Sequence, residues 1–221
     1  GPQNDLINGF DYIPCPGNDR IVLVAVSAES NNNNNEPDYG TITLGGQPLT
    51  AIKNPNGTIV PPPGSGGTGL PDETNLWVGY LKESQINNMD GDTLIVNFDV
   101  PPNNWEEATV RVIAATYENV DQTNPIIDSS SDTNTITGTS LQAGPVTVGT
   151  GNQMIYFVAH GKKAATHTAP SGYTEQIEIP GTGPLNSHMI AVATRNSLTA
   201  SVDENPTATF SEDDQQIMVN A

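Results

Sequence analysis

Carboxylates are the side chains of this sequence best able to do chemistry, and several fall in short turn-like segments between apolar runs. The candidate metal ligands are Asp90, Asp92, Glu118, Asp121, Asp128 and Asp132. A hard cation such as Ca²⁺ needs about six to eight oxygen ligands, and loops supply side-chain and backbone oxygens together. None of these spacings matches an EF-hand loop, so solvated turns also fit the same residues. Ca²⁺ is therefore the one candidate cofactor.

The three histidines, His160, His167 and His188, are the next candidates, because a zinc site needs three or four converging ligands. A hairpin can bring the first two near each other, and His188 begins a neighbouring apolar segment. We expect ordinary polar or partly buried histidines rather than a metal site. Glu175 and Glu178 lie three positions apart in an extended segment, so we expect their side chains to point to opposite faces of a strand.

Hydrolysis or sugar binding would require converging carboxylates or exposed aromatic rings. No serine occupies a nucleophile-elbow motif, and aromatic residues are only 5% of the chain, which weakens both a glycosidase and an aromatic sugar platform. Trp105, Tyr80 and Tyr173 are the residues that could stack on a sugar, although core or loop packing also explains them. The segment "GSGGTG" (Gly64–Gly69) has the letters of a dinucleotide-binding motif but lacks the flanking strand and helix that phosphate binding requires.

The charge balance excludes several classes of partner. The chain carries 25 Asp and Glu residues against 7 Lys and Arg, a formal net charge of -18 at pH 7. Such a polyanion repels phosphate backbones and anionic bilayers, so we expect no nucleic-acid partner and no membrane-surface binding. No apolar run approaches the roughly 18 residues of a membrane span, so no membrane insertion is expected. Cys15 is the only cysteine, which excludes an intrachain disulfide.

Short apolar or alternating segments separated by turns must position these residues. The segment "RIVLVAVSAE" (Arg20–Glu29) is apolar on both faces at first and predicts a central strand. "GTITLGGQPLTAIKN" (Gly40–Asn54) predicts two short strands around a Gly45-Gly46 turn, and Glu83–Asn88 can hold one helical turn. Roughly a dozen strands at spacings of about 8 to 15 residues predict an all-β fold, an antiparallel two-sheet β-sandwich that is jelly-roll-like and has long polar loops.

The domain organisation is expected to be simple. Residues 1–20 are polar and turn-rich and are predicted to be a lead-in that wraps the domain, with Gly1 and Pro2 the remnant of an affinity tag. Residues 21–221 show no linker-like change in composition and are predicted to form a single β-sandwich domain.

Several phrases of the sequence together resemble a domain that recurs in exported and cell-surface proteins of bacteria. They are "VLVAVSAESNNNNNEPDYGTITLGGQPLT", "NLWVGYLKESQI", "VRVIAATYENVDQTNPI" and "GYTEQ", the last with Tyr173 where the pattern usually has Trp. The resemblance covers most of residues 21–221 and implies a surface or extracellular β-sandwich module. It implies no catalytic residues, because no reaction is attached to the pattern.

These observations favour a non-enzymatic extracellular or cell-surface module with a structural or adhesive role, stabilised by Ca²⁺ if the acidic loops hold it. Its expected partners are glycans or other surface and matrix proteins. One alternative is a carbohydrate-binding module of a secreted polysaccharide-processing system. A second is a glycoside hydrolase or other hydrolase whose carboxylates converge only in the folded chain.

Overall fold

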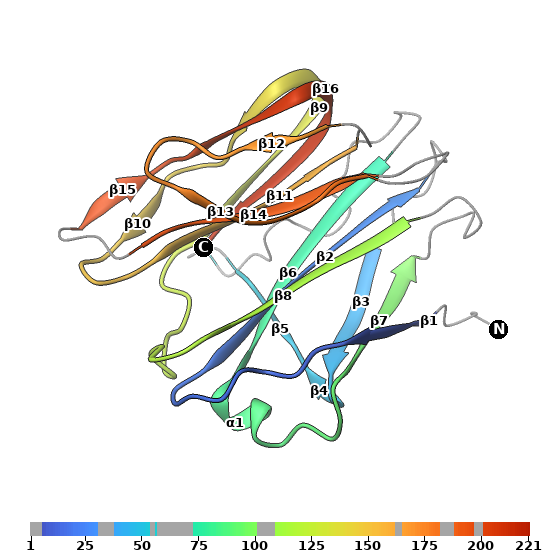
Figure 1. The fold of residues 1–221 in the computed structure, drawn as a ribbon, viewed down its shortest axis with the longest axis vertical. Helices are drawn as coiled ribbons and strands as arrows, with labels where there is room; N and C mark the ends of the chain where they lie inside the picture. Colours follow the sequence, from blue (N-terminus) through green and yellow to red (C-terminus); the bar gives the residue numbers. More distant parts are fainter. Residues whose placement is uncertain are drawn as a thin grey trace.

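The computed structural model describes residues 6–30, 38–53, 56, 73–100, 109–161, 165–181, 188–196 and 201–221. Trp105 and the segment Gly64–Gly69 lie outside these residues. The regular structure of the described part is almost entirely β-strand, and the strands pair antiparallel (Figure 1), so the predicted all-β, sandwich-like fold is confirmed. Within the same part, no helix is long and apolar enough to cross a membrane.

The strands of the described residues form four sheets. The first sheet has the order β1 (Leu6–Asp11), β7 (Thr93–Val100), β3 (Asp38–Leu44) and β4 (Gln47–Pro48). The second sheet has the order β5 (Thr50–Ala51), β6 (Glu73–Lys82), β2 (Ile21–Ser30) and β8 (Thr109–Tyr117). The third sheet has the order β12 (His167–Thr168), β16 (Thr207–Asn220), β11 (Met154–His160), β14 (Met189–Arg195) and β13 (Thr174–Ile179), with β9 (Ser130–Gln142) also paired to β16. The fourth pairs β10 (Val146–Val148) with β15 (Val202–Glu204).

The second sheet is buried on both faces, which explains the apolar run in β2. Ile21 and Leu23 pack toward the third sheet, in one core cluster with residues of β11, β14 and β16. Val22 and Val24 point the other way, into a second cluster with residues of β3 and β7. Because successive side chains of a strand face opposite sides, a strand between two layers favours apolar residues on both faces, as Ile21–Val26 shows. The expectation of a central strand is therefore confirmed, and the first sheet adds a layer beside the two packed sheets.

Local signals in the N-terminal half place the turns correctly. Gly45 and Gly46 both have positive φ angles, 53° and 73°, and form the two-residue turn between β3 and β4, as a type I′ hairpin requires. The expected helical turn is α1 (Glu83–Ile86), directly after β6. Within the predicted N-terminal lead-in, Leu6–Asp11 forms β1 and pairs with β7 at the edge of the first sheet.

Candidate functional site

A cleft of about 600 Å³ opens where β2 begins, β8 ends and the segment between β8 and β9 passes beside the third sheet. Its apolar lining comes from the second, third and fourth sheets and from the segment between β8 and β9: Ile21, Leu23, Ile126, Val146, Val148 and Ile155. Its polar lining is formed by side-chain amides and carboxylates: Asn119, Asn124, Asn152, Gln153, Asn196, Glu118, Asp121 and Asp128. A concave apolar surface with a few converging polar groups is the usual form of a small-ligand site.

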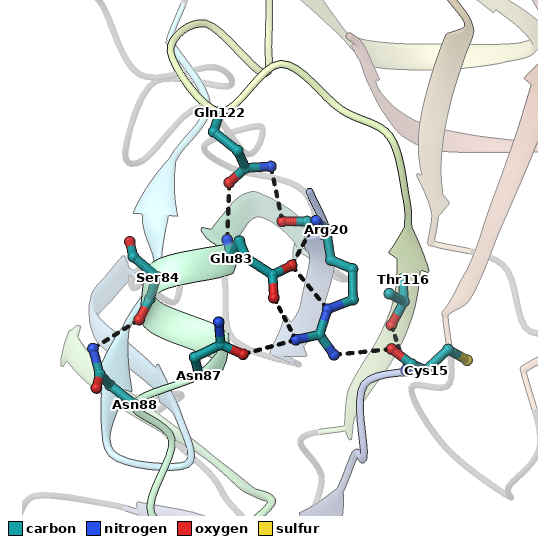
Figure 2. A network of polar contacts seen from close by, with 8 residues as sticks. All are labelled: Cys15, Arg20, Glu83, Ser84, Asn87, Asn88, Thr116 and Gln122. Atoms are coloured by element: carbon teal, nitrogen blue, oxygen red, sulfur yellow. Dashed lines mark hydrogen bonds and ion pairs between the residues drawn. The ribbon is translucent and has the colours of Figure 1, made fainter. Parts of the chain in front are cut away.

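The loop that forms one wall of the cleft is held by Gln122, as Figure 2 shows. The Gln122 side chain accepts a hydrogen bond from the backbone N–H of Glu83 (2.9 Å) and donates one to the carbonyl of Arg20 (3.2 Å). The Arg20 guanidinium in turn donates to both carboxylate oxygens of Glu83 (2.9 and 2.7 Å), to Asn87 (2.9 Å) and to the carbonyl of Cys15 (3.1 Å). The hydrogen bonds that the Arg20 side chain and backbone N–H donate to the Glu83 carboxylate lower the pKa of Glu83 to about 2. The network fixes the wall to α1 and to the start of β2.

The carboxylates of Asp121 and Asp128 shape the same loop. Asp121 Oδ1 accepts hydrogen bonds from the backbone N–H groups of Thr123 (2.7 Å) and Asn124 (3.4 Å), and these bonds lower the pKa of Asp121. Asp128 accepts from the N–H of Ser129 through Oδ1 and from that of Thr147 through Oδ2, both at 2.8 Å. Asp128 therefore ties the loop to β10. Both residues serve as turn-forming acceptors.

The six carboxylates predicted to bind calcium do not lie at one place. Glu118, Asp121 and Asp128 line the cleft. Asp90 and Asp92 lie in the turn between α1 and β7, and the exposed Asp132 belongs to β9, where its Oδ1 accepts from the N–H of Thr133 (2.8 Å). Among the described residues, none of the six belongs to a group of three His, Cys, Asp or Glu side chains whose ligand atoms lie close enough to share a metal ion. Calcium binding by these loops stays a prediction.

The aromatic candidates do not line the cleft in the part of the chain that is described. Tyr80 is half-buried against the core between the second and third sheets. Tyr173 is also half-buried; its hydroxyl donates to Glu204 (2.8 Å), and its ring contacts that of Tyr156 at 5.4 Å. Tyr117 is the aromatic residue that the cleft does contain, and burial raises its pKa to about 12. Stacking of Tyr80, Tyr173 or Trp105 on a sugar stays a prediction.

A second group of side chains that could bind a ligand, around His167, was not predicted from the sequence. His167 Nδ1 lies 2.5 Å from Glu175 Oε2, and the backbone N–H of His167 donates to Glu178 Oε2 at 3.0 Å. His167 Nε2 lies 2.9 Å from the hydroxyl of the buried Tyr156. The ligand atoms of the histidine and of the two glutamates all lie within 4.8 Å of one another.

The expectation that Glu175 and Glu178 point to opposite faces is wrong, because β13 is irregular. Glu175 pairs with Ala193 of β14, but Ile177 pairs with Val192, so one extra residue is inserted at this point of the ladder. Such a bulge reverses the alternation of side chains. In a regular strand, Glu175 would share a face with Ile179, which packs against the core between the sheets. The residue types of β13 alone give no signal of the bulge, because the packing of Ile179 is set by the tertiary structure.

The other two histidines belong to separate polar networks. His160 Nε2 donates to the carbonyl of Glu212 (3.1 Å). Nε2 of the buried His188 contacts Ser27 Oγ, and its Nδ1 lies 3.4 Å from Glu29 Oε2. This order of groups resembles a Ser-His-acid triad. All three of these side chains are buried, and burial together with the charge of Arg111 lowers the pKa of His188 to about 3. A nucleophile has to reach its substrate, so this arrangement is structural.

Comparisons of the chain with protein-family models, with curated proteins and with solved structures found no match. The two sites are therefore interpreted from their own geometry. The cleft is a concave, acidic and amide-rich surface between packed sheets, and the cluster around His167 is a compact set of nitrogen and oxygen donors.

Proposed function

We propose that this protein is a non-enzymatic extracellular or cell-surface binding module that holds a neutral glycan in the cleft and acts in adhesion. The observation that carries the proposal is the cleft itself, about 600 Å³ in volume, with an apolar floor and a rim of amides and carboxylates. Sugar rings present apolar C–H faces and a perimeter of hydroxyl groups, and this lining offers partners to both.

The polar groups of the rim are suited to hydroxyl groups. The side-chain amides of Asn124 and Asn152 line the cleft, and neither forms a hydrogen bond within the described part of the chain. An amide offers both a donor and an acceptor, which is what a hydroxyl group needs. Gln153 and Asn196 also line the cleft, and their side chains bond to each other at 2.9 Å, which holds this part of the rim in place.

Charge supports a neutral ligand over an anionic one. Glu118, Asp121 and Asp128 line the cleft, and its described lining contains no Lys or Arg. The chain as a whole carries a formal net charge of -18. Phosphates, sulfates and uronic acids would be repelled from such a surface, whereas the hydroxyl groups of a neutral sugar can donate to the carboxylates.

The state of the carboxylates supports binding over catalysis. A glycosidase needs one carboxylic acid with a raised pKa beside a second carboxylate. Backbone N–H groups lower the pKa of Asp121, and both oxygens of Asp128 accept backbone hydrogen bonds. The bonds to Asp121 favour its charged form. The bonds to both residues hold their side chains in the loop. The resemblance to exported bacterial surface domains supports the same assignment, because no reaction is attached to that pattern.

The experiment is a screen on an array of neutral and anionic polysaccharides, followed by calorimetry with the best ligand. The double variant Asn124→Ala/Asn152→Ala should bind roughly tenfold or more weakly, since each lost hydrogen bond contributes about 1 kcal/mol. Asn205→Ala is the matched control, because Asn205 is exposed between β15 and β16 and lies outside the cleft. Absence of binding to every neutral glycan, or equal binding by the double variant, would refute the proposal.

A further inference from the structure

The cluster of His167, Glu175 and Glu178 lies away from the cleft, beside the core on the other face of the third sheet. Its neighbour Tyr156 belongs to that core, while the alternate residues Ile155 and Phe157 of β11 face the second sheet. We propose that His167, Glu175 and Glu178 form a binding site for a first-row divalent cation, with Zn²⁺ as the best fit.

The donor set has the composition that such an ion prefers. One imidazole nitrogen and two carboxylates are borderline and hard ligands, and together they suit Zn²⁺ better than Ca²⁺, which takes oxygen ligands alone. The ligand atoms lie within 4.8 Å of one another, so a small closure brings them to one ion. Glu175 is exposed, which leaves the remaining coordination positions facing solvent.

Tyr156 fixes the imidazole for this role. A histidine that ligates a metal through Nδ1 donates its Nε2–H to a partner that holds the ring in place. The hydroxyl of Tyr156 occupies that position, 2.9 Å from Nε2, and the Tyr156 side chain is fully buried. The ring of His167 is also buried, and its Nδ1 points at Glu175.

The charges of the cluster are an independent argument for a cation. Two carboxylates converge on one histidine, and in the described part of the chain neither Glu175 nor Glu178 forms an ion pair with Lys or Arg. Two carboxylates so close repel each other unless a positive charge lies between them. The bulge in β13 produces this convergence at the expense of a regular ladder, and bulges commonly re-aim side chains at functional sites. A divalent ion would offset the repulsion and join β12 to β13.

The test is Zn²⁺ binding to the full chain after treatment with a chelator, measured by calorimetry and by competition with a chromophoric chelator. We expect one equivalent of Zn²⁺ to bind, Ca²⁺ not to compete at equal concentration, and NMR signals of the His167 imidazole to shift at that equivalent. Glu175→Gln and Glu178→Gln should each weaken binding by at least the roughly 10- to 100-fold that loss of an outer-shell partner costs, and the double variant should abolish it.

Glu212→Gln is the matched control, because Glu212 is an exposed glutamate outside the cluster; its backbone carbonyl, which the substitution keeps, accepts a hydrogen bond from His160. It should bind Zn²⁺ as the unaltered protein does. Failure of the unaltered protein to bind Zn²⁺, or binding by the double variant with unchanged affinity, would overturn the proposal. The Asn124→Ala/Asn152→Ala variant should keep its Zn²⁺ affinity. The Zn²⁺ site and the glycan-binding cleft can therefore be refuted separately.

Discussion

The buried His188 makes the stability of this protein sensitive to mild acid. Its side chain is fully buried between Ser27, Thr109 and Glu29, and burial with the nearby charge of Arg111 lowers its pKa from 6.5 to about 3. The unfolded chain therefore takes up a proton first as the pH falls. The contribution of neutral His188 to the free energy of unfolding is therefore fully present above pH 6.5 and is lost as the pH falls from 6.5 toward 3. Below pH 3 this group causes no further change.

The size of the effect follows from the two pKa values. Each pH unit between them costs at most about 1.4 kcal/mol, so the free energy of unfolding should fall by about 2 kcal/mol between pH 7 and pH 5 through His188 alone. For a chain of this length, that loss lowers Tm by roughly 4–8 °C. Glu83 and Asp121 have lowered pKa values, so their contributions are lost only at lower pH.

The assay is urea unfolding of the protein and of His188→Gln at pH 8, 7, 6 and 5, followed by circular dichroism. Glutamine keeps a polar side chain but does not titrate, so the general cost of the substitution appears at pH 8 as a constant offset. The difference between the two proteins should shrink by about 2 kcal/mol toward pH 5. Parallel pH profiles would refute the reasoning, as would NMR signals of a protonated His188 imidazole in the native protein at pH 5.

Two further predictions concern the ion pair between Arg20 and Glu83 and the acidic loops. Glu83→Gln should lower the free energy of unfolding by about 1–2 kcal/mol at pH 7, because it breaks the bidentate ion pair with Arg20. Partial exposure of both side chains to solvent keeps the stabilisation by this pair small. Since the pKa of Glu83 is lowered from 4.5 to about 2, the stabilisation is complete above pH 4.5 and is lost as the pH falls through 2; a gap that persists in urea unfolding at pH 2 would contradict this. If the acidic loops bind Ca²⁺, adding Ca²⁺ to chelator-treated protein should raise Tm. At a free Ca²⁺ concentration of 100 times Kd, the free energy of unfolding should increase by about 2.7 kcal/mol. An unchanged melting curve across that titration would show that these loops do not bind Ca²⁺.

Much of the fold was predictable because its signals are local. The apolar run of β2 predicted a central strand, and the Gly45-Gly46 pair predicted a hairpin turn whose positive φ angles suit glycine. The strand β1 was missed, since Leu6–Asp11 has little apolar alternation and becomes a strand by pairing with β7. At the C-terminus, β16 is one long strand whose pairing with β9 is irregular between Thr209 and Gln216.

The sequence by itself determined the all-β class, the main turns and the acidic surface, because side-chain alternation, glycine conformation and charge are properties of short stretches of chain. Only the tertiary structure decided which distant residues meet. The cleft joins Ile21, Asn124 and Asn196, and the cluster around His167 depends on a bulge that moves Glu175 to the face of Glu178. Strand pairing and register set these contacts, and the hydrophobic pattern permits several registers before the sheets pack.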